Sequence, residues 1–385
     1  MTCPACGSIS TEILLRLPGV PVHVGLLWRT PDEARACGRG DIDLALCETC
    51  GYVWNASFDP DRLDYAEDYD NALHHSPKFA AWEADLVAGL VERHDLQGRR
   101  IAEIGPGDGR FLAALCLAGG SSGIGFEPGH NPERQSPLVD DADVEIHDAF
   151  ADADSLRGAD VDFVVSRHVL EHIPEPGILT EAIRGGVGER GSTYLEVPNF
   201  DWALDRGAFE DLMYEHCGYY TTETLAHLLR RGGFTDVEAA ATFDGLFTAA
   251  EAIYAGGSPG PDAIDTDIVE SIRKRIGMLA DRIDSIDAEL SSRRDACQTI
   301  AAWGGGARAV GLLNLVPSAD AIGDVIDVNP RKQGTFVTGT GHAISGPERL
   351  EAEPPDAVLV VNPIYLDEIR DMLAERGLHP ELLTV

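Results

Sequence analysis

A short glycine-rich segment at residues 103–109 constrains the fold of this chain more than any other feature. It reads Glu-Ile-Gly-Pro-Gly-Asp-Gly, begins within the apolar stretch Ile101–Ile104 and runs into a helical pattern at Arg110–Leu117. Glycines at a strand-to-helix turn let the backbone approach a ligand closely, and the N-terminus of the following helix favours electronegative groups. The segment therefore predicts a βα unit with a ligand-binding loop.

Apolar stretches typical of buried strands recur along the chain and alternate with helical patterns. The expected strands are Ile101–Ile104, Ile124–Glu127, Val144–His147, Val161–Ser166 and Thr193–Val197. The expected helices are Pro77–Arg93, Arg110–Leu117, Gly177–Gly186 and Thr222–Arg231. Such alternation indicates a parallel sheet covered by helices on both faces. The fold class is therefore α/β, with a Rossmann-like central domain.

A second glycine-rich segment indicates a second Rossmann-like unit near the end of the chain. Residues 304–309 read Gly-Gly-Gly-Ala-Arg-Ala and follow a strand pattern that begins at Thr299. Asp324–Val328 and Ala357–Val361 are its further expected strands. Before it, residues 263–302 carry an apolar stripe at helical spacing, which predicts one long helix.

Four of the eight cysteines form two CxxCG motifs. Cys3 and Cys6 make the first, Cys47 and Cys50 the second. Two intervening residues let both thiolates of a pair point at one tetrahedral metal ion, and glycine suits the tight turn that follows. Because four thiolates leave no open position, the motifs predict a structural Zn²⁺ ion; the alternative is a set of reduced, unligated thiols. The other cysteines are scattered, which argues against a disulfide scaffold.

These features divide the chain into three expected domains. The run Gly256-Gly257-Ser258-Pro259-Gly260-Pro261 is typical of a linker. The expected divisions are a zinc-binding domain at 1–60, a central α/β domain at 61–255 and a second Rossmann-like domain at 262–385.

The charge balance excludes several classes of partner. Thirty Lys and Arg residues stand against 65 Asp and Glu, a formal net charge of -35. Such a surface repels nucleic acids and anionic membranes, and a phosphate-bearing ligand would need a local basic patch. No apolar run is long enough to span a membrane, and the polar start shows no signal peptide. We therefore expect a cytoplasmic protein.

The first glycine-rich loop favours S-adenosylmethionine as its ligand. It departs from the GxGxxG dinucleotide pattern, and Asp108 within it suits a sulfonium cation better than a pyrophosphate. Glu127, after the next strand, is placed to accept the ribose hydroxyls, while Asp148 is a candidate for the adenine amino group with Phe150 packed nearby. The expected donor-binding residues are Glu103, Gly105, Pro106, Gly107, Gly109, Glu127, Asp148, Ala149, Phe150, Ser166 and His168. A purely structural turn is the alternative.

The loop, the acid at Glu127 and the segment Val164–Ile173 together resemble class I S-adenosylmethionine-dependent methyltransferases. The two cysteine pairs, Asn314 and the tail Asp327–Gly334 resemble the narrower family of sugar C-methyltransferases of deoxysugar biosynthesis. The resemblance implies methyl transfer to a carbon, C3 by expectation, beside the ketone of a dTDP-linked 4-keto-deoxysugar in antibiotic biosynthesis. S-adenosylhomocysteine would be the other product.

Methylation at carbon requires a base, because a proton must leave the carbon beside the ketone before the methyl group arrives. Histidine has a suitable pKa, and His216 is the candidate base, with Glu215 orienting it or the sugar. His172 matches a second active-site histidine of the family. The family also has a tyrosine three residues before the base, where this chain has Met213, and Tyr214 lies two before. Either Tyr65 or Tyr69 supplies the family's N-terminal tyrosine.

The second loop has the GxGxxA form of a dinucleotide site, with Asp327 after the next strand. The resemblance instead implies that this domain helps to hold the nucleotide-sugar. The expected substrate-binding residues are Asn199, Gly306, Arg308, Asn314, Asn329, Arg331 and Lys332. The remaining alternatives are an O- or N-methyltransferase, an NAD-dependent oxidoreductase and a zinc-stabilised binding protein. The oligomeric state stays open.

Overall fold

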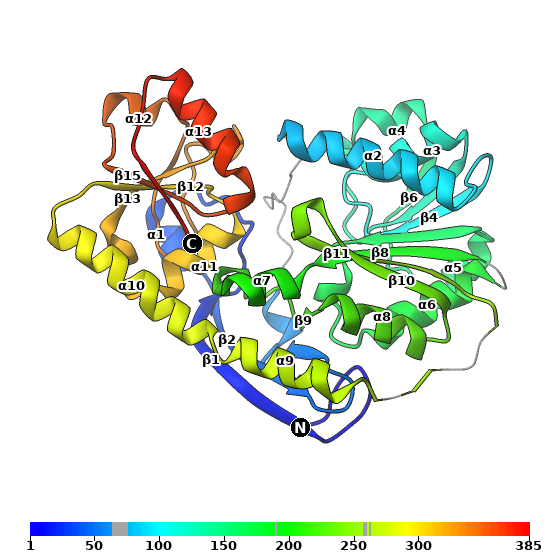
Figure 1. Ribbon diagram of the computed structural model, residues 1–385. Helices are drawn as coiled ribbons and strands as arrows, with labels where there is room; N and C mark the ends of the chain where they lie inside the picture. The colour runs from blue at the N-terminus through cyan, green and yellow to red at the C-terminus, as the bar shows by residue number, and fades with distance from the viewer. Residues whose placement is uncertain (64–75, 189–190, 257–259, 262) are drawn as a thin grey trace.

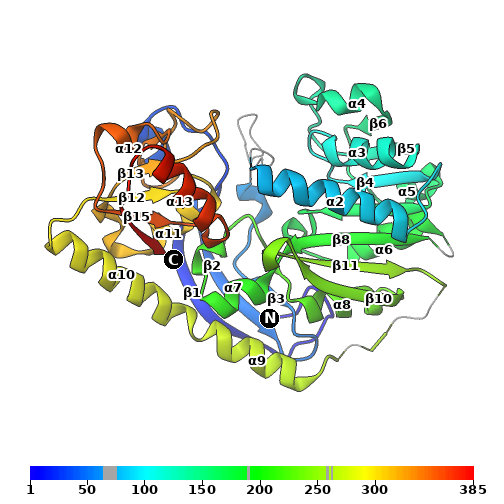
Figure 2. The same ribbon diagram turned by 45° about the horizontal axis from the view of Figure 1, so that its top comes forward.

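The computed structural model describes residues 1–63, 76–188, 191–256, 260–261 and 263–385, and these form three β-sheets (Figure 1). The central and C-terminal sheets lie in two separate lobes. Strands of the N-terminal sheet run alongside the helices α9 and α10 that connect the lobes, as both views show (Figure 2). The fold class α/β is confirmed.

The central sheet has seven strands in the order β10-β11-β8-β7-β4-β5-β6. Five are parallel, namely β4 (Arg100–Ile104), β5 (Ser122–Phe126), β6 (Asp143–His147), β7 (Phe163–Arg167) and β8 (Ser192–Pro198). At one side of the sheet, the edge strand β10 (Thr235–Thr242) and its neighbour β11 (Phe247–Ile253) pair antiparallel, which differs from the all-parallel expectation. Only the short turn Phe243–Gly245 joins them, and such a connection is too short for a parallel crossover.

Helices cover both faces of this sheet because strand residues alternate between them. Ile101 and Phe163 pack with the face of α2 (Pro77–Arg93) and α3 (Arg110–Gly119). Their neighbours Ala102 and Val164 pack on the opposite face, in the core shared with three helices. Those helices are α5 (Ala153–Ala159), α6 (Gly177–Val187) and α8 (Thr222–Arg231). Because strands β4 to β8 run parallel, their carboxyl ends meet at one edge of the sheet, where ligands bind in such folds.

The N-terminal sheet is antiparallel, and one of its strands comes from the central segment of the chain. Its order is β1 (Thr11–Pro21), β2 (Arg39–Cys47), β3 (Val53–Asn55) and β9 (Gly218–Tyr219). Because β9 pairs with β3, the residues just before β9 are held against the N-terminal sheet. Packing therefore crosses the linear division of the chain at residue 60.

The connection to the last domain consists of two helices, where one was expected. α9 (Thr266–Ile276) ends at Gly277, and α10 (Leu279–Asp295) begins two residues later. The apolar stripe changes its packing partner within α10, since Leu279 at its start still lies in the core of the N-terminal sheet. Ile272 of α9 packs in the core of the N-terminal sheet, whereas Leu290 of α10 packs in the core of the C-terminal domain.

The C-terminal domain is a parallel sheet of five strands, as a second Rossmann-like unit requires. The order is β14 (Ile344–Ser345), β13 (Ile322–Ile326), β12 (Ile300–Trp303), β15 (Ala357–Val360) and β16 (Glu381–Thr384). α11 (Ala307–Leu315) and α13 (Leu366–Glu375) pack in the cores on opposite faces. Among the described residues of all three domains, no helix is long and apolar enough to cross a membrane.

Candidate active site and metal centre

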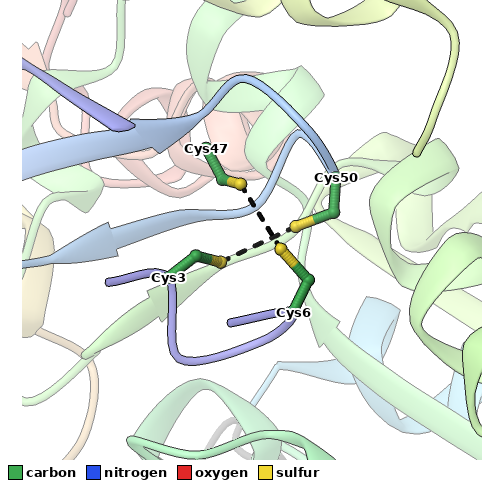
Figure 3. A group of neighbouring side chains, drawn as sticks. All are labelled: Cys3, Cys6, Cys47 and Cys50. Carbon is green, nitrogen blue, oxygen red and sulfur yellow. Dashed lines mark hydrogen bonds between the residues drawn. The ribbon is translucent and has the colours of Figure 1, made fainter. Parts of the chain in front are cut away.

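The four cysteines of the CxxCG motifs converge at one end of the N-terminal sheet (Figure 3). Cys3 and Cys6 lie before β1, Cys47 is the last residue of β2, and Cys50 lies in the turn toward β3. The Cys3 and Cys50 Sγ atoms are 3.7 Å apart, the Cys6 and Cys47 Sγ atoms 3.6 Å, and all four sulfurs lie within 4.8 Å of one another. These separations exceed the roughly 2.05 Å of a disulfide.

The geometry of this cluster fits a zinc ion. Zn–S bonds of about 2.3 Å place the sulfurs of a tetrahedral site about 3.8 Å apart, close to the separations found. Gly7 and Gly51 have φ of 77° and 70°, and their N–H groups donate to the carbonyls of Cys3 and Cys47. These left-handed turns bring the second cysteine of each pair back toward the first. Four sulfurs leave no position for a substrate, so such an ion would be structural.

The first glycine-rich loop requires its glycines. Gly105, Gly107 and Gly109 all have left-handed φ values, between 58° and 78°. A Cβ on Gly105 would lie 2.3 Å from Val169 Cγ2, and one on Gly109 would lie 2.5 Å from Ile146 Cδ1. The side chains of Val169 and Ile146 therefore pack closely against the loop, and α3 starts at Gly109.

The predicted acids lie at the carboxyl ends of neighbouring strands. Glu127, after β5, accepts a hydrogen bond from the Gly107 N–H through Oε2 at 2.8 Å, and burial raises its pKa. Asp148, after β6, accepts from the Gly129 N–H at 2.7 Å. Phe150 is 81% exposed, so its ring lies on the surface near this edge. Of the neighbouring predicted residues, Ala149 donates its N–H to the His147 carbonyl and Pro106 lies against Gly125 of β5.

Two further donor-site candidates hold buried oxygens that have no hydrogen-bond partner within the described residues. They are Glu103 Oε2 on β4 and Ser166 Oγ on β7, the strand beside it. Burial raises the pKa of Glu103 to about 8, although Arg167 opposes the shift. Buried polar atoms are nearly always paired in native proteins. These two atoms therefore fit a polar ligand bound at this edge of the sheet.

Two histidines that are 44 positions apart in the sequence meet beside this edge. His172 ends the short helix η3 (Leu170–His172) after β7, and His216 lies two residues before β9. Their ring centroids are 5.0 Å apart and their planes are inclined at 80°. His172 Nδ1 lies 2.9 Å from the Glu215 carbonyl oxygen, which can only accept. Nδ1 therefore carries the hydrogen, and a neutral His172 ring presents Nε2 as an acceptor.

The surroundings of His216 keep its ring neutral. Burial lowers the pKa of His216 to about 4 and His172 adds to this effect, while the carboxylates of Glu171 and Glu215 oppose it. At neutral pH the ring is unprotonated and able to accept a proton, as a general base must be.

Glu215 is tied to the N-terminal domain by a residue that sequence reasoning missed. Its Oε1 accepts from Nδ1 of His23, at 3.1 Å, and the Glu215 side chain is 1% exposed. His23 lies just after β1. A histidine inside the apolar stretch 20–24 was the available signal, but nothing in the sequence pointed to its partner.

His168 lies at the centre of a buried ionic network that the sequence did not reveal. It follows β7 with φ 56°, a left-handed value rare outside glycine. Its Nε2 lies 3.4 Å from Glu196 Oε1, and its Nδ1 lies 3.7 Å from Glu171 Oε1. Although burial opposes a charge, these carboxylates raise the pKa of His168 to about 9. Arg167 continues the network from Glu196, at 2.8 Å, to Glu83 of α2, at 3.0 Å.

The tyrosine candidates lie apart from the histidine pair or outside the described residues. The Tyr214 hydroxyl accepts from the Asp59 N–H at 2.9 Å, and its ring packs on Phe58. These contacts place Tyr214 in the core of the N-terminal sheet. Tyr65 and Tyr69 belong to the segment that the structure does not describe.

The basic substrate-binding candidates are already engaged within the protein. Arg308 contacts Asp211 Oδ2 at 2.6 Å, donates to Asn362 Oδ1 and lies over the Trp202 ring. Lys332 Nζ lies 3.5 Å from Asp327 Oδ2. Arg308 therefore joins the C-terminal domain to the central segment, and any role in binding a diphosphate would compete with this contact.

The remaining substrate-binding candidates hold turns and helix ends in place. Asn199 caps α7 (Phe200–Arg206) and donates to the Gly245 carbonyl. Asn314 donates to the Val310 and Thr338 carbonyls, and Asn329 accepts from the Arg331 N–H. Gly306 starts α11, where a Cβ would lie 3.2 Å from Lys332 Nζ.

Comparisons with known proteins agree with this architecture. Residues 72–239 match the family model described as a methyltransferase domain, and residues 275–377 match a C-methyltransferase C-terminal domain. The chain is 23% identical over 398 residues to C-methyltransferase NovU from Streptomyces niveus, covering 96% of this chain and 91% of that protein.

Similar solved structures include an O-methyltransferase family protein from Burkholderia thailandensis, at 18% identity and a TM-score of 0.39 over 46% of this chain and 56% of that chain. Another is the 1,6-didemethyltoxoflavin-N1-methyltransferase of the same organism, at 17% identity and a TM-score of 0.35 over 45% and 78% of the two chains.

Proposed function

Because the chain belongs to the S-adenosylmethionine-dependent methyltransferases with a C-methyltransferase C-terminal domain, we propose a specific acceptor for its methyl group. The acceptor is the carbon beside the ketone, C3, of a nucleotide-linked 4-keto-deoxysugar, with thymidine diphosphate as the expected nucleotide. The observation that carries this proposal is His216, a neutral imidazole held beside His172 and Glu171 at the edge of the central sheet.

In the proposed reaction, His216 removes the proton from C3. The C3–H bond breaks, its electron pair moves toward the ketone to give an enolate, and the proton passes to a ring nitrogen of His216. S-adenosylmethionine, when bound, supplies an electrophilic methyl group to this carbon. His172, whose Nδ1 is engaged by the Glu215 carbonyl, offers Nε2 for a hydrogen bond with a substrate hydroxyl or amine and so orients the sugar.

The donor would be held by residues along the carboxyl edge of the central sheet. Glu127 and Asp148 stand at the ends of β5 and β6, where they would accept from ribose hydroxyls and the adenine amino group. The unpartnered oxygens of Glu103 and Ser166 lie on adjoining strands and would receive further polar contacts. The three glycines of the loop at 105–109 carry no side chains, so the donor could approach the backbone closely there.

The test is incubation with S-adenosylmethionine and a panel of nucleotide sugars, analysed by mass spectrometry. The proposal predicts the addition of one methyl group to 4-keto sugars and none to the matching 4-hydroxy sugars. Methylation of the 4-hydroxy sugars would favour an O- or N-methyltransferase instead, because those reactions need no adjacent ketone.

We also propose that the cysteine cluster binds one structural zinc ion per chain. Metal analysis of the purified protein would show about one zinc, and Cys47→Ser would lower it. The variant should lose thermal stability in the N-terminal domain more than it loses donor affinity, because the cluster is remote from the 105–109 loop in the chain and belongs to another sheet. A metal analysis that finds no zinc in the purified native protein would contradict this assignment.

A further inference from the structure

Glu171 is a buried acid beside the proposed base, and the reaction described above gives it no role. Its side chain is 2% exposed, and a carboxylate oxygen lies within 4.8 Å of one ring nitrogen of His172 and one of His216. Oε1 faces His168, whereas Oε2 has no hydrogen-bond partner within the described part of the chain. An unpartnered, buried carboxylate oxygen next to a histidine pair requires a physical reason.

Proton transfer to His216 creates a buried positive charge, which the unpartnered carboxylate oxygen of Glu171 can stabilise. The imidazolium formed would be a positive charge in a site where burial and the neighbouring His172 both disfavour it. A buried charge is tolerated when an opposite charge lies close by. Glu215, the other nearby acid, already binds His23 through Oε1.

Glu171 is itself held as an anion. Burial favours its neutral form, but the ion-pair contact with His168 at 3.7 Å and the nearby His172 more than offset this effect, so the pKa of Glu171 is lowered. His168 is fixed in turn by Glu196 and by its backbone N–H, which donates to the Glu196 carbonyl. The acid is therefore ionised and faces His168 before any substrate binds.

We propose that Glu171 is a positioning residue that stabilises the positive charge formed on His216 when this histidine takes the C3 proton, and that His168 holds Glu171 in place. The inference rests on the proposed function, in which His216 is the base. No further reactant is needed, since the proton moves from carbon to nitrogen and the electron pair stays on the sugar. The proton leaves His216 for solvent after the product departs.

The proposal has a signature in pH dependence. The groups that face His216 are Glu171, His172 and His168 from the segment after β7, and Glu215 from its own segment, with His23 behind Glu215. Of these, the anions make His216 more basic. In Glu171→Gln the base becomes weaker, so the acid limb of the rate profile moves to lower pH and the plateau falls by about 10- to 100-fold.

The experiment measures exchange of the C3 proton of a dTDP-4-keto-6-deoxysugar in heavy water across a range of pH. It compares the wild type with Glu171→Gln, Glu171→Asp and a matched control, Glu210→Gln. Glu210 is also a buried acid with an unpartnered Oε2, but it lies in η4 (Phe209–Asp211) against the C-terminal domain. We expect a lowered plateau and a shifted acid limb in Glu171→Gln, partial recovery in Glu171→Asp, and an unshifted limb in Glu210→Gln.

Three results would overturn the inference. An unchanged profile in Glu171→Gln would remove the role, and a lowered plateau with an unmoved limb would show a merely structural one. A second metal ion per wild-type chain that is lost in Glu171→Gln would make the three side chains a metal site instead. Rapid exchange in His216→Asn is a different failure, because it would reject the proposed base rather than its counter-charge.

Discussion

In both α/β domains, an acidic side chain after the second strand accepts a backbone N–H from the glycine-rich loop that follows the first strand. Glu127 binds the Gly107 N–H, and Asp327 binds the Gly305 N–H, both at 2.8 Å. The two loops differ in what else these acids contact. Asp327 uses its other oxygen for the Asn329 N–H and has Lys332 at 3.5 Å, so its carboxylate is satisfied within the domain.

The first loop is less completely satisfied by its own surroundings. Only Oε2 of Glu127 has a hydrogen-bond partner among the described residues, and Glu103 and Ser166 nearby hold buried oxygens without one. All three glycines of the first loop are left-handed, whereas in the second Gly304 alone has a positive φ. The loop of the central domain therefore leaves polar groups available to a ligand, whereas the polar groups of the C-terminal loop are satisfied within their own domain.

The largest expected effect tests whether the chemistry depends on the central domain rather than on the C-terminal one. We expect His216→Asn to retain donor binding and to slow C3 proton exchange by about two to four decades, the usual contribution of a positioned base. The measurement is exchange in heavy water, followed by mass. A variant that exchanges and methylates at the wild-type rate would move the base elsewhere, with His172 the next candidate.

A matched pair of acid deletions tests the difference between the loops directly. Glu127→Ala should weaken S-adenosylmethionine binding by roughly 1–3 kcal/mol, because the ribose hydroxyls lose their acceptor. Asp327→Ala should leave donor affinity unchanged, since its oxygens serve its own loop. Calorimetry on both variants is the measurement, and equal losses would show that the two loops do not differ as described.

The smallest expected effect concerns the pH dependence of folding stability, at Glu210, where the C-terminal domain meets the central segment. Burial and Asp211 raise the pKa of Glu210 to about 8, against 4.5 for an ordinary glutamate. Between these values the folded protein keeps a proton that the unfolded chain has lost, so the free energy of unfolding falls as pH rises.

Glu210→Gln removes this titration and should flatten the pH dependence. We expect the variant to gain stability relative to the wild type as pH rises from about 5 to about 8, measured by urea unfolding. Parallel stability curves for the two proteins would mean that Glu210 titrates normally in the folded state.

Local patterns were sufficient to predict the repeated elements of the fold. Helix Pro77–Arg93 has the expected bounds, and the five parallel strands of the central sheet lie within two residues of the expected ones. Periodicity carries this information because each buried face recurs at the period of its own element. The pattern could not show that α9 and α10 are separate, because the apolar stripe continues across Gly277 from Ile276 to Leu279 in one core.

The sequence by itself determined which residue types were available: two CxxCG pairs, two glycine-rich loops, and His172 and His216 in distinct motifs. Only the tertiary structure decided which of them meet. The contact of β9 with η3 brings His216 to His172 and Glu171, and the pairing of β9 with β3 brings Glu215 to His23 of the N-terminal domain. Tyr214, beside the same motif, turns instead into the core of the N-terminal sheet. Side-chain partners this far apart in the chain are set by strand pairing and core packing, and a one-dimensional pattern encodes neither.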